Sequence, residues 1–237
     1  MAAADQLRRD IARRQETDYQ IDFALNLLLT IITCLLWGFV SWYRILNRRD
    51  RHFARSADFA DDAVRALRER AEALGRSDRI APQLGTLEVI ARDLRTQARE
   101  RNAILWVILG IFTLKAVFLV MFYFLEEDYR RHERTEVEFA RHLDEALQAL
   151  GVPCTRASFV PATVERSYPL YLVVTLLTCG LFGFYWFYRV NEDQNRHMDA
   201  HAAWEPEVLG CLAGPLPAGA PAPPPAPPAP PPGPAGA

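Results

Sequence analysis

Three histidines are the residues of this 237-residue chain whose type and spacing could bind a metal ion. His52, His132 and His197 each follow an arginine, and each lies at the same position in a segment of about 43 residues that recurs three times without gaps. Imidazole nitrogens are common zinc ligands, and three equivalent segments could bring them together around an axis. Whether they meet depends on the path of the chain, because each segment begins inside a long apolar run.

Lys115 is a second candidate, since it is the only lysine in the chain and lies in the middle of the second apolar run. A cation at the centre of a bilayer costs at least ~2.5–3.5 kcal/mol, so it is expected to face a partner, a cavity or water. One interpretation is an anion, lipid-headgroup or proton site. The other is a lysine that snorkels or pairs with the mid-run hydroxyls of Thr33, Thr113 and Thr178.

The recurring frame opens at Leu25, Leu105 and Leu170. The three copies share an opening leucine, a mid-run threonine, a run-ending tyrosine, an Arg-His pair and a closing leucine. Two further columns are always aromatic, and they consist of Trp42, Phe122 and Phe187, and then Phe59, Phe139 and Trp204. A repeat at a fixed frame indicates a triplicated structural unit.

The apolar runs cover 21–43, 103–125 and 168–190, and each is long enough to cross a bilayer as a helix of about 20 residues. We therefore predict an all-α integral membrane protein with three transmembrane helices, long extramembrane helical extensions and a cytoplasmic helical hairpin. In this topology His132 lies across the membrane from the other two histidines, so no metal or other cofactor is expected. Alternatively, each run bends near its threonine and returns as a re-entrant hairpin, which would leave all three Arg-His pairs on one face.

Turn residues and composition divide the chain further. The predicted segments are an amphipathic N-terminal segment (1–20), repeat 1 (21–68), a helical hairpin connection (69–102), repeat 2 (103–150), a loop (151–167), repeat 3 (168–212) and a disordered Pro/Ala-rich tail (213–237). No breaker occurs between Leu87 and Phe124, so the second helix of the hairpin is expected to enter the bilayer without interruption.

Residues within and at the ends of the runs have types that are typical of membrane helices. Small and hydroxyl residues allow close helix packing, and we assign this role to Thr30, Gly38, Gly110, Thr175, Gly180 and Gly183. Aromatic and basic residues form interfacial anchors, and here these are Trp42, Tyr43, Arg44, Trp186, Phe187, Tyr188 and Arg189.

Charge and motifs exclude several classes of protein. The formal net charge is −2 and no segment is strongly basic, which argues against nucleic acid as a partner. Cys34 and Cys179 lie inside apolar runs, and Cys154 and Cys211 lie far apart in sequence, so no disulfide framework is expected. The chain contains no phosphate loop, nucleophile elbow or paired Cys-x-x-Cys motif, so we expect that it is not an enzyme.

The third copy also resembles a known family over 178–189, Thr-Cys-Gly-Leu-Phe-Gly-Phe-Tyr-Trp-Phe-Tyr-Arg. This stretch is similar to the signature of a bacterial integral-membrane domain of unknown function, Thr-x-Gly-(Ile/Leu)-(Tyr/Phe)-Gly-x-Tyr-Trp-x-Tyr-(Lys/Arg). Copy 1 departs from it with Leu35 in place of the first glycine and Ser41 in place of the tryptophan. Copy 2 lacks both glycines and the basic residue after Tyr123. The resemblance implies a bacterial membrane location and no established activity.

We therefore expect a multi-pass protein of the bacterial inner membrane. Its N-terminus should lie outside and its C-terminus in the cytoplasm, because the connection 44–102 carries more arginines than 126–168. The expected function is a non-enzymatic scaffold or partner-interaction module that contacts the lipid bilayer and either forms a homo-oligomer or binds another membrane protein. The alternative is an oligomeric transporter of small solutes or lipids organised around Lys115.

Overall fold

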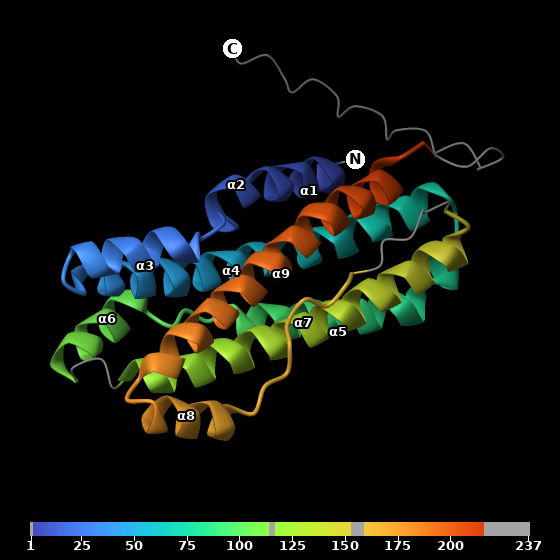
Figure 1. Ribbon diagram of the computed structural model, residues 1–237. Coiled ribbons are helices and arrows are strands. Elements are labelled where there is room, and N and C mark those ends of the chain that lie inside the picture. Colours follow the sequence, from blue (N-terminus) through green and yellow to red (C-terminus); the bar gives the residue numbers. More distant parts are fainter. Residues whose placement is uncertain (1, 114–116, 153–158, 216–237) are drawn as a thin grey trace, which may run out of the picture.

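The computed structural model describes residues 2–113, 117–152 and 159–215, and helix is the only regular secondary structure in these ranges. The elements are α1 (Ala2–Ala12), α2 (Arg14–Thr17), α3 (Phe23–Ile32), α4 (Leu36–Ala73), the 3-10 turn η1 (Ser77–Arg79), α5 (Ala81–Gln97), α6 (Ala103–Phe112), α7 (Val117–Leu150), α8 (Tyr168–Leu177) and α9 (Leu181–Ala213). The long helices α4, α7 and α9 pack together along the molecule, α5 packs on α4 and α7, and α1 packs on α4 and α9 (Figure 1). The predicted all-α class is confirmed.

Equivalent residues of the three copies meet in successive layers between α4, α7 and α9. The first aromatic column forms a triangle whose ring centroids lie 5.1, 5.2 and 6.1 Å apart. The members of this triangle are Trp42, Phe122 and Phe187. The second aromatic column and the closing leucines are buried further along the same three helices, and they are Phe59, Phe139, Trp204, Leu67, Leu147 and Leu212. The two aromatic columns and the closing leucines are therefore core positions of a pseudo-threefold bundle.

The first and third apolar runs each consist of two helices joined by a bend, α3 to α4 and α8 to α9 (Figure 1). The second run also contains two helices, since α6 ends at Phe112 and α7 begins at Val117. The prediction of continuous helices over 21–43, 103–125 and 168–190 is therefore wrong, because each of these ranges contains two separate helices. Hydropathy summed along a run does not register a reversal of direction, which explains the error. Within the described ranges, none of the helices combines the length and the apolar character needed to cross a bilayer.

The threonine that is identical in the three copies stabilises each bend. The Thr33 hydroxyl donates to the Leu29 carbonyl at 2.8 Å and accepts from the Trp37 N–H at 2.8 Å. Thr178 makes the equivalent bonds at 2.8 and 3.0 Å, and Thr113 makes them at 2.8 and 3.4 Å. One side chain thus satisfies a carbonyl at the end of the first helix and an amide at the start of the second.

The first and third bends each contain two residues in the left-handed backbone conformation. Cys34 and Leu35 have φ angles of 49° and 75°, and Cys179 and Gly180 have φ angles of 50° and 90°. Glycine adopts this region without a steric penalty, whereas Leu35 adopts it at some cost. The thiols of Cys34 and Cys179 are free and exposed at these bends. Cys211 is disulfide-bonded, although the cysteine spacing in the sequence predicts no disulfide framework.

The hairpin connection also differs in one respect from the sequence expectation. α4 ends at Ala73, Gly75 adopts a φ of 63°, and α5 runs antiparallel along α4 (Figure 1). However, α5 ends at Gln97, and the Asn102 side chain accepts from the Leu105 amide to begin α6. The expected uninterrupted helix from 87 to 124 is therefore wrong, because a capping asparagine starts a new helix. The tail beyond residue 215 lies outside the described residues.

Candidate functional site

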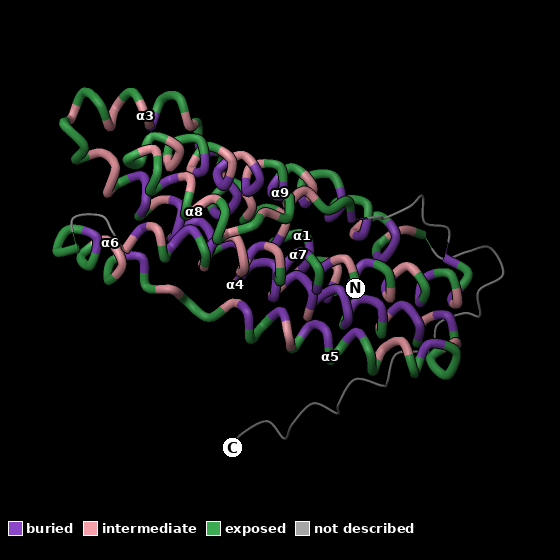
Figure 2. The backbone as a smooth tube through the Cα atoms, turned by 60° about the horizontal axis from the view of Figure 1, so that its bottom comes forward, coloured by how far each residue is buried: buried purple, intermediate pink, exposed green. Residues whose placement is uncertain are grey.

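Large exposed apolar side chains gather at one end of the molecule, formed by α3, α6, α8 and the first turns of α4, α7 and α9. We call this region the hairpin end. Figure 2 shows it as largely exposed, whereas the long helices are mostly buried where they face one another. The most exposed side chains lie next to the bends, and they are Ile32, Leu36, Phe112, Leu177 and Leu181. The apolar runs therefore present much of their surface outward.

Most of the predicted helix-packing residues line one groove of about 590 Å³ between the first and third hairpins. They are Thr30, Gly38, Thr175, Gly180 and Gly183. A Cβ atom on Gly183 would lie 3.3 Å from Thr175 Cγ2, so glycine permits a close approach there. Gly110 lies instead in the second hairpin, directly against the ring of Phe118.

The predicted interfacial anchors separate into two groups. Trp42 and Trp186 are buried in the protein, where Trp42 stacks on Phe118 at 4.6 Å and the Trp186 indole N–H donates to Glu126 at 2.9 Å. The anchor role is therefore wrong for these two residues, because neighbouring helices cover them. The rest keep some exposure, with Tyr43 and Tyr188 the most exposed, followed by Arg44, Arg189 and Phe187.

The predicted polar site around Lys115 is only partly described. Lys115 itself lies outside the described residues. The hydroxyls of Thr33, Thr113 and Thr178 each bond to backbone groups of their own hairpin. Local capping of the bends accounts for the three threonines.

The histidines of the three Arg-His pairs meet in the middle of the bundle, one from each of α4, α7 and α9. The ring centroids of His52, His132 and His197 lie 5.0 to 5.8 Å apart, and all three side chains are fully buried. Glu136, one turn after His132, places its carboxylate among them, and one donor atom from each of the four residues lies within 4.8 Å of the others. The expectation that His132 lies apart is therefore wrong, because every hairpin returns its chain to the same side.

A second set of carboxylates contacts the outer nitrogens of these rings. His52 Nδ1 lies 3.0 Å from Asp18 Oδ1, and His197 Nδ1 lies 3.2 Å from Glu133 Oε1. Asp18 comes from the segment after α2, whereas Glu133 comes from α7. Each carboxylate thereby orients one ring with its Nε2 atom toward the centre.

His201, one turn after His197 on α9, extends the cluster. Its Nδ1 lies 2.7 Å from Glu205 Oε1, and its Nε2 lies 3.1 Å from the Glu136 carboxylate. The buried guanidinium of Arg55 then joins Glu205 to Asp18, with distances of 2.7 Å to each. The cluster is thus a continuous polar network that links the segment after α2 with α4, α7 and α9.

Burial and the neighbouring carboxylates shift the pKa values of the histidines in different directions. Burial lowers the pKa of His52 well below its usual value and lowers the pKa of His132, so both rings are neutral near pH 7. Burial also acts to lower the pKa of His201, but the carboxylates of Glu136 and Glu205 outweigh it and raise this pKa to about 9. Burial acts to raise the pKa of Glu136, yet the surrounding imidazoles hold it well below the usual range.

Sequence reasoning missed the carboxylates of this network. The pairs His132-x-x-x-Glu136 and His201-x-x-x-Glu205 have the i, i+4 spacing that puts two side chains on one helix face, and this signal could have found both glutamates. Asp18 carries no such signal, since its partner is 34 residues away in sequence.

Part of the chain is similar to a known family. No curated protein and no solved structure matches this chain. Residues 166–213 match the family model described as "Domain of unknown function (DUF4234)". This range contains α8 and α9 in full, including His197 and His201. A domain of this family is therefore found over the third hairpin and its long helix.

Proposed function

We propose that this protein is a non-enzymatic scaffold anchored by its three hairpins in a single leaflet of the bacterial inner membrane. The observation that carries the proposal is the concentration of exposed apolar side chains at the hairpin end. Contiguous apolar surface of this kind marks a site of contact with lipid or with another protein. The remaining bundle, with its charged outer surface, lies on the water side.

The length of the short helices fits insertion into one leaflet. α3, α6 and α8 are each 10 residues long. At a rise of 1.5 Å per residue each helix reaches about 15 Å, which is half of the ~30 Å hydrocarbon core. The bends therefore come to lie near the bilayer midplane.

The hydrogen bonding of the bends also suits a lipid environment. Unpaired backbone groups are costly in hydrocarbon, so a re-entrant segment needs partners for the carbonyls and amides that its bend exposes. The Thr33 and Thr178 hydroxyls supply such partners at 2.8 to 3.0 Å. A threonine at each bend is thus what single-leaflet insertion would require.

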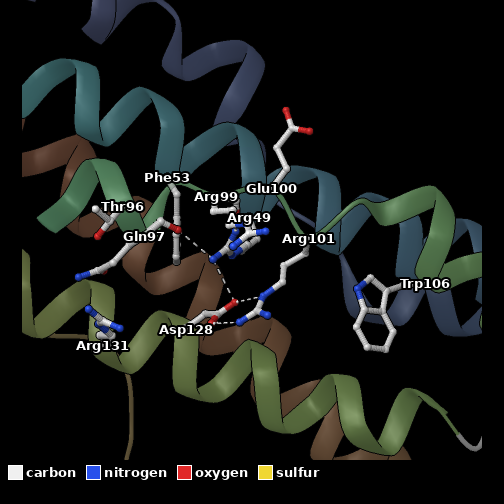
Figure 3. A pocket seen from close by; sticks show the side chains of 10 residues that line it. All are labelled: Arg49, Phe53, Thr96, Gln97, Arg99, Glu100, Arg101, Trp106, Asp128 and Arg131. Carbon is white, nitrogen blue, oxygen red and sulfur yellow. Dashed lines mark hydrogen bonds and ion pairs between the residues drawn. The ribbon is translucent and has the colours of Figure 1, made fainter. Parts of the chain in front are cut away.

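An arginine-lined pocket next to the base of α6 supports contact with lipid headgroups. Figure 3 shows Arg49 and Arg101 directed toward Asp128. The pocket has a volume of about 400 Å³, and Arg99 and Arg131 also line it, so its basic residues outnumber its acidic ones. Basic groups at this level of the molecule would attract lipid phosphates.

The proposed arrangement has a consequence for topology. α1 packs against both α4 and α9 on the water-side bundle. Single-leaflet insertion therefore leaves the N-terminal segment and the end of α9 on the same side of the membrane, unlike the arrangement with three spans.

Within the membrane, the outward apolar faces of the hairpins offer a surface to a second copy or to another membrane protein. A scaffold needs such a surface, whereas a transporter must provide a path across both leaflets. Hairpins of about 15 Å leave the opposite leaflet uncrossed. The transporter alternative organised around Lys115 is for this reason less well supported.

Labelling at the bends tests the proposal. Cys34 is exposed at the first bend, so a spin label there in a Cys179→Ser variant reports depth in reconstituted vesicles. We expect the Cys34 label to be accessible to lipid-dissolved oxygen and shielded from water-soluble reagents on both sides. The control is Val89→Cys on α5, which is exposed on the bundle and should react from one side only.

Two outcomes would contradict the proposal. Reaction of Cys34 from the side opposite to Val89→Cys would indicate a spanning topology, and reaction from the same side would show that the hairpins are not inserted. The scaffold role has its own test. A protein that stays monomeric in lipid and captures no other membrane protein after crosslinking would argue against it.

A further inference from the structure

Two buried imidazoles in the centre of the bundle, those of His52 and His197, point their Nε2 atoms toward each other. His52 Nε2 and His197 Nε2 lie 3.0 Å apart. The other nitrogen of each ring is next to a carboxylate, Asp18 or Glu133. An ionised carboxylate only accepts hydrogen bonds, so each Nδ1 must carry the hydrogen. In neutral rings, both Nε2 atoms then present lone pairs to one another.

Other donors hold both carboxylates as hydrogen-bond acceptors. The Arg55 guanidinium donates to Asp18 Oδ2 at 2.7 Å, and the amides of Ala162 and Thr163 donate to Glu133 at 2.6 and 2.9 Å. Two opposed lone pairs at 3.0 Å repel, unless a proton or a metal ion lies between them.

The third ring lacks well-formed hydrogen bonds. Among the described residues, neither nitrogen of His132 makes one, although the side chain is completely buried. Its Nε2 lies 2.9 Å from Glu136 Oε1 as an ion-pair contact without hydrogen-bond geometry, and its Nδ1 has no hydrogen-bond partner. A buried imidazole in this state is costly, and a bound cation would satisfy one of its nitrogens.

The donor atoms lie close enough together for one ion to bind them after the side chains move inward. The nitrogens and the carboxylate oxygen all lie within 4.8 Å of one another. Zinc binds imidazole nitrogen at about 2.0–2.1 Å, so two ligands of a tetrahedral site lie roughly 3.3 Å apart. The His52 and His197 Nε2 atoms, 3.0 Å apart, are already near this separation, and the more distant donor atoms must approach one another on binding.

We propose that His52, His132, Glu136 and His197 bind a divalent transition-metal ion of the zinc type in a closed, structural site. Each copy of the repeat contributes one imidazole, so the ion joins α4, α7 and α9 at their common axis. Asp18 and Glu133 act as positioning residues, since they hold the rings with Nε2 inward. All four ligands are buried, and this is typical of structural rather than catalytic zinc sites.

The first experiment measures metal in the full-length protein, purified in detergent without chelators. We expect a single zinc ion per chain, and cobalt(II) substitution should give the visible absorption of a tetrahedral site. Removal of the ion by a strong chelator should lower the Tm, and zinc but not magnesium should restore it, because metal bound only to the folded state stabilises it. Manganese and iron are measured in the same samples, since they accept similar ligands.

Substitutions then identify the ligands. Glu136→Gln and His132→Asn should abolish stoichiometric binding, and Asp18→Asn should weaken it by about 10–100-fold, as is usual for residues that orient a ligand. The matched control is His142→Asn, because His142 lies on the same helix as His132 but pairs with Glu145 away from the cluster. This variant should keep its zinc.

The proposal would be overturned by a folded wild-type protein that contains only trace metal and takes up neither zinc, cobalt, manganese nor iron. The wild-type measurement decides this even where a variant fails to fold. A proton on Nε2 of His52 or His197 in ¹⁵N-correlated NMR spectra of that protein would also overturn it, since the cluster would then be a protonated histidine network. Binding that survived both ligand substitutions would refute the assigned site.

Discussion

The threonine at each bend offers the most direct quantitative test of the fold. Thr178→Val keeps the shape of the side chain but removes the hydroxyl that donates to Val174 O at 2.8 Å and accepts from the Phe182 N–H at 3.0 Å. The lost hydrogen bond is worth about 0.5–1.5 kcal/mol, and the amide left without a partner costs about 1–3 kcal/mol. We expect a total loss of about 1.5–4.5 kcal/mol, which is a roughly 10- to 2,000-fold change in the unfolding equilibrium.

The free-energy cost of the equivalent valine substitutions in the other two copies should depend on the lengths of the hydrogen bonds that they remove. Thr33 accepts from the next helix at 2.8 Å, so Thr33→Val should cost about as much as Thr178→Val. Thr113 accepts at 3.4 Å, so its amide bond is weaker and Thr113→Val should cost less. Serine at each position is the control, because it retains the hydroxyl.

The assay is reversible unfolding in mixed micelles, followed by circular dichroism, for the three valine and three serine variants. Each serine variant should have a stability close to that of the wild type, and Thr113→Val should be the mildest valine variant. Equal stability of the valine and serine variants would refute the capping role. In that case the identical threonine would need another explanation.

Three further predictions concern other parts of the molecule. Arg55→Met should destabilise the protein by about 3–5 kcal/mol in chemical unfolding, because it removes the buried guanidinium that joins two buried carboxylates. A loss below about 1 kcal/mol would contradict the buried network. Burial acts to raise the pKa of the Asp58 carboxyl, but ion pairs with Arg95 and Arg13 hold this pKa below the usual range. The ionised carboxylate therefore stabilises the fold above about pH 4, and this stabilisation is lost as the pH falls through the lowered pKa. Asp58→Asn should accordingly cost about 0.2–1 kcal/mol at pH 7 and almost nothing in acid, and a cost independent of pH would exclude the ion pairs as its cause. Leu177→Arg should weaken vesicle binding in flotation assays by about 2.5–3.5 kcal/mol, because it puts a charge into the inserted hairpin end. Val89→Arg on the bundle is the control and should leave vesicle binding unchanged. Equal effects of the two changes would place the hairpin end outside the bilayer.

Several features of the fold could be predicted from the sequence because their signals are local. Periodic apolar residues predict helices, and Gly75 predicts the turn between α4 and α5. The recurring columns predict that the three copies are equivalent, and equivalent residues do meet in layers. The matched spacing also put His52, His132 and His197 in equivalent positions before any path of the chain was known.

Other features needed the tertiary structure. The burial of Trp186 against its neighbours depends on which helices cover it, and an aromatic residue at the end of an apolar run has the same local pattern whether lipid or protein surrounds it. The contribution of Asp18 to the histidine cluster depends on how the N-terminal segment docks onto α4. Neither property can be obtained from hydropathy or periodicity.

The sequence by itself determined that a helical, apolar unit occurs three times in one register, with an Arg-His pair in every copy. Only the tertiary structure decided that each unit consists of two helices rather than one, and that three histidines and Glu136 converge. The physical reason is that a bend of a few residues changes little in local composition, yet it decides on which side all the following residues lie. Contacts between residues far apart in sequence, such as His52 and His197, follow from that decision.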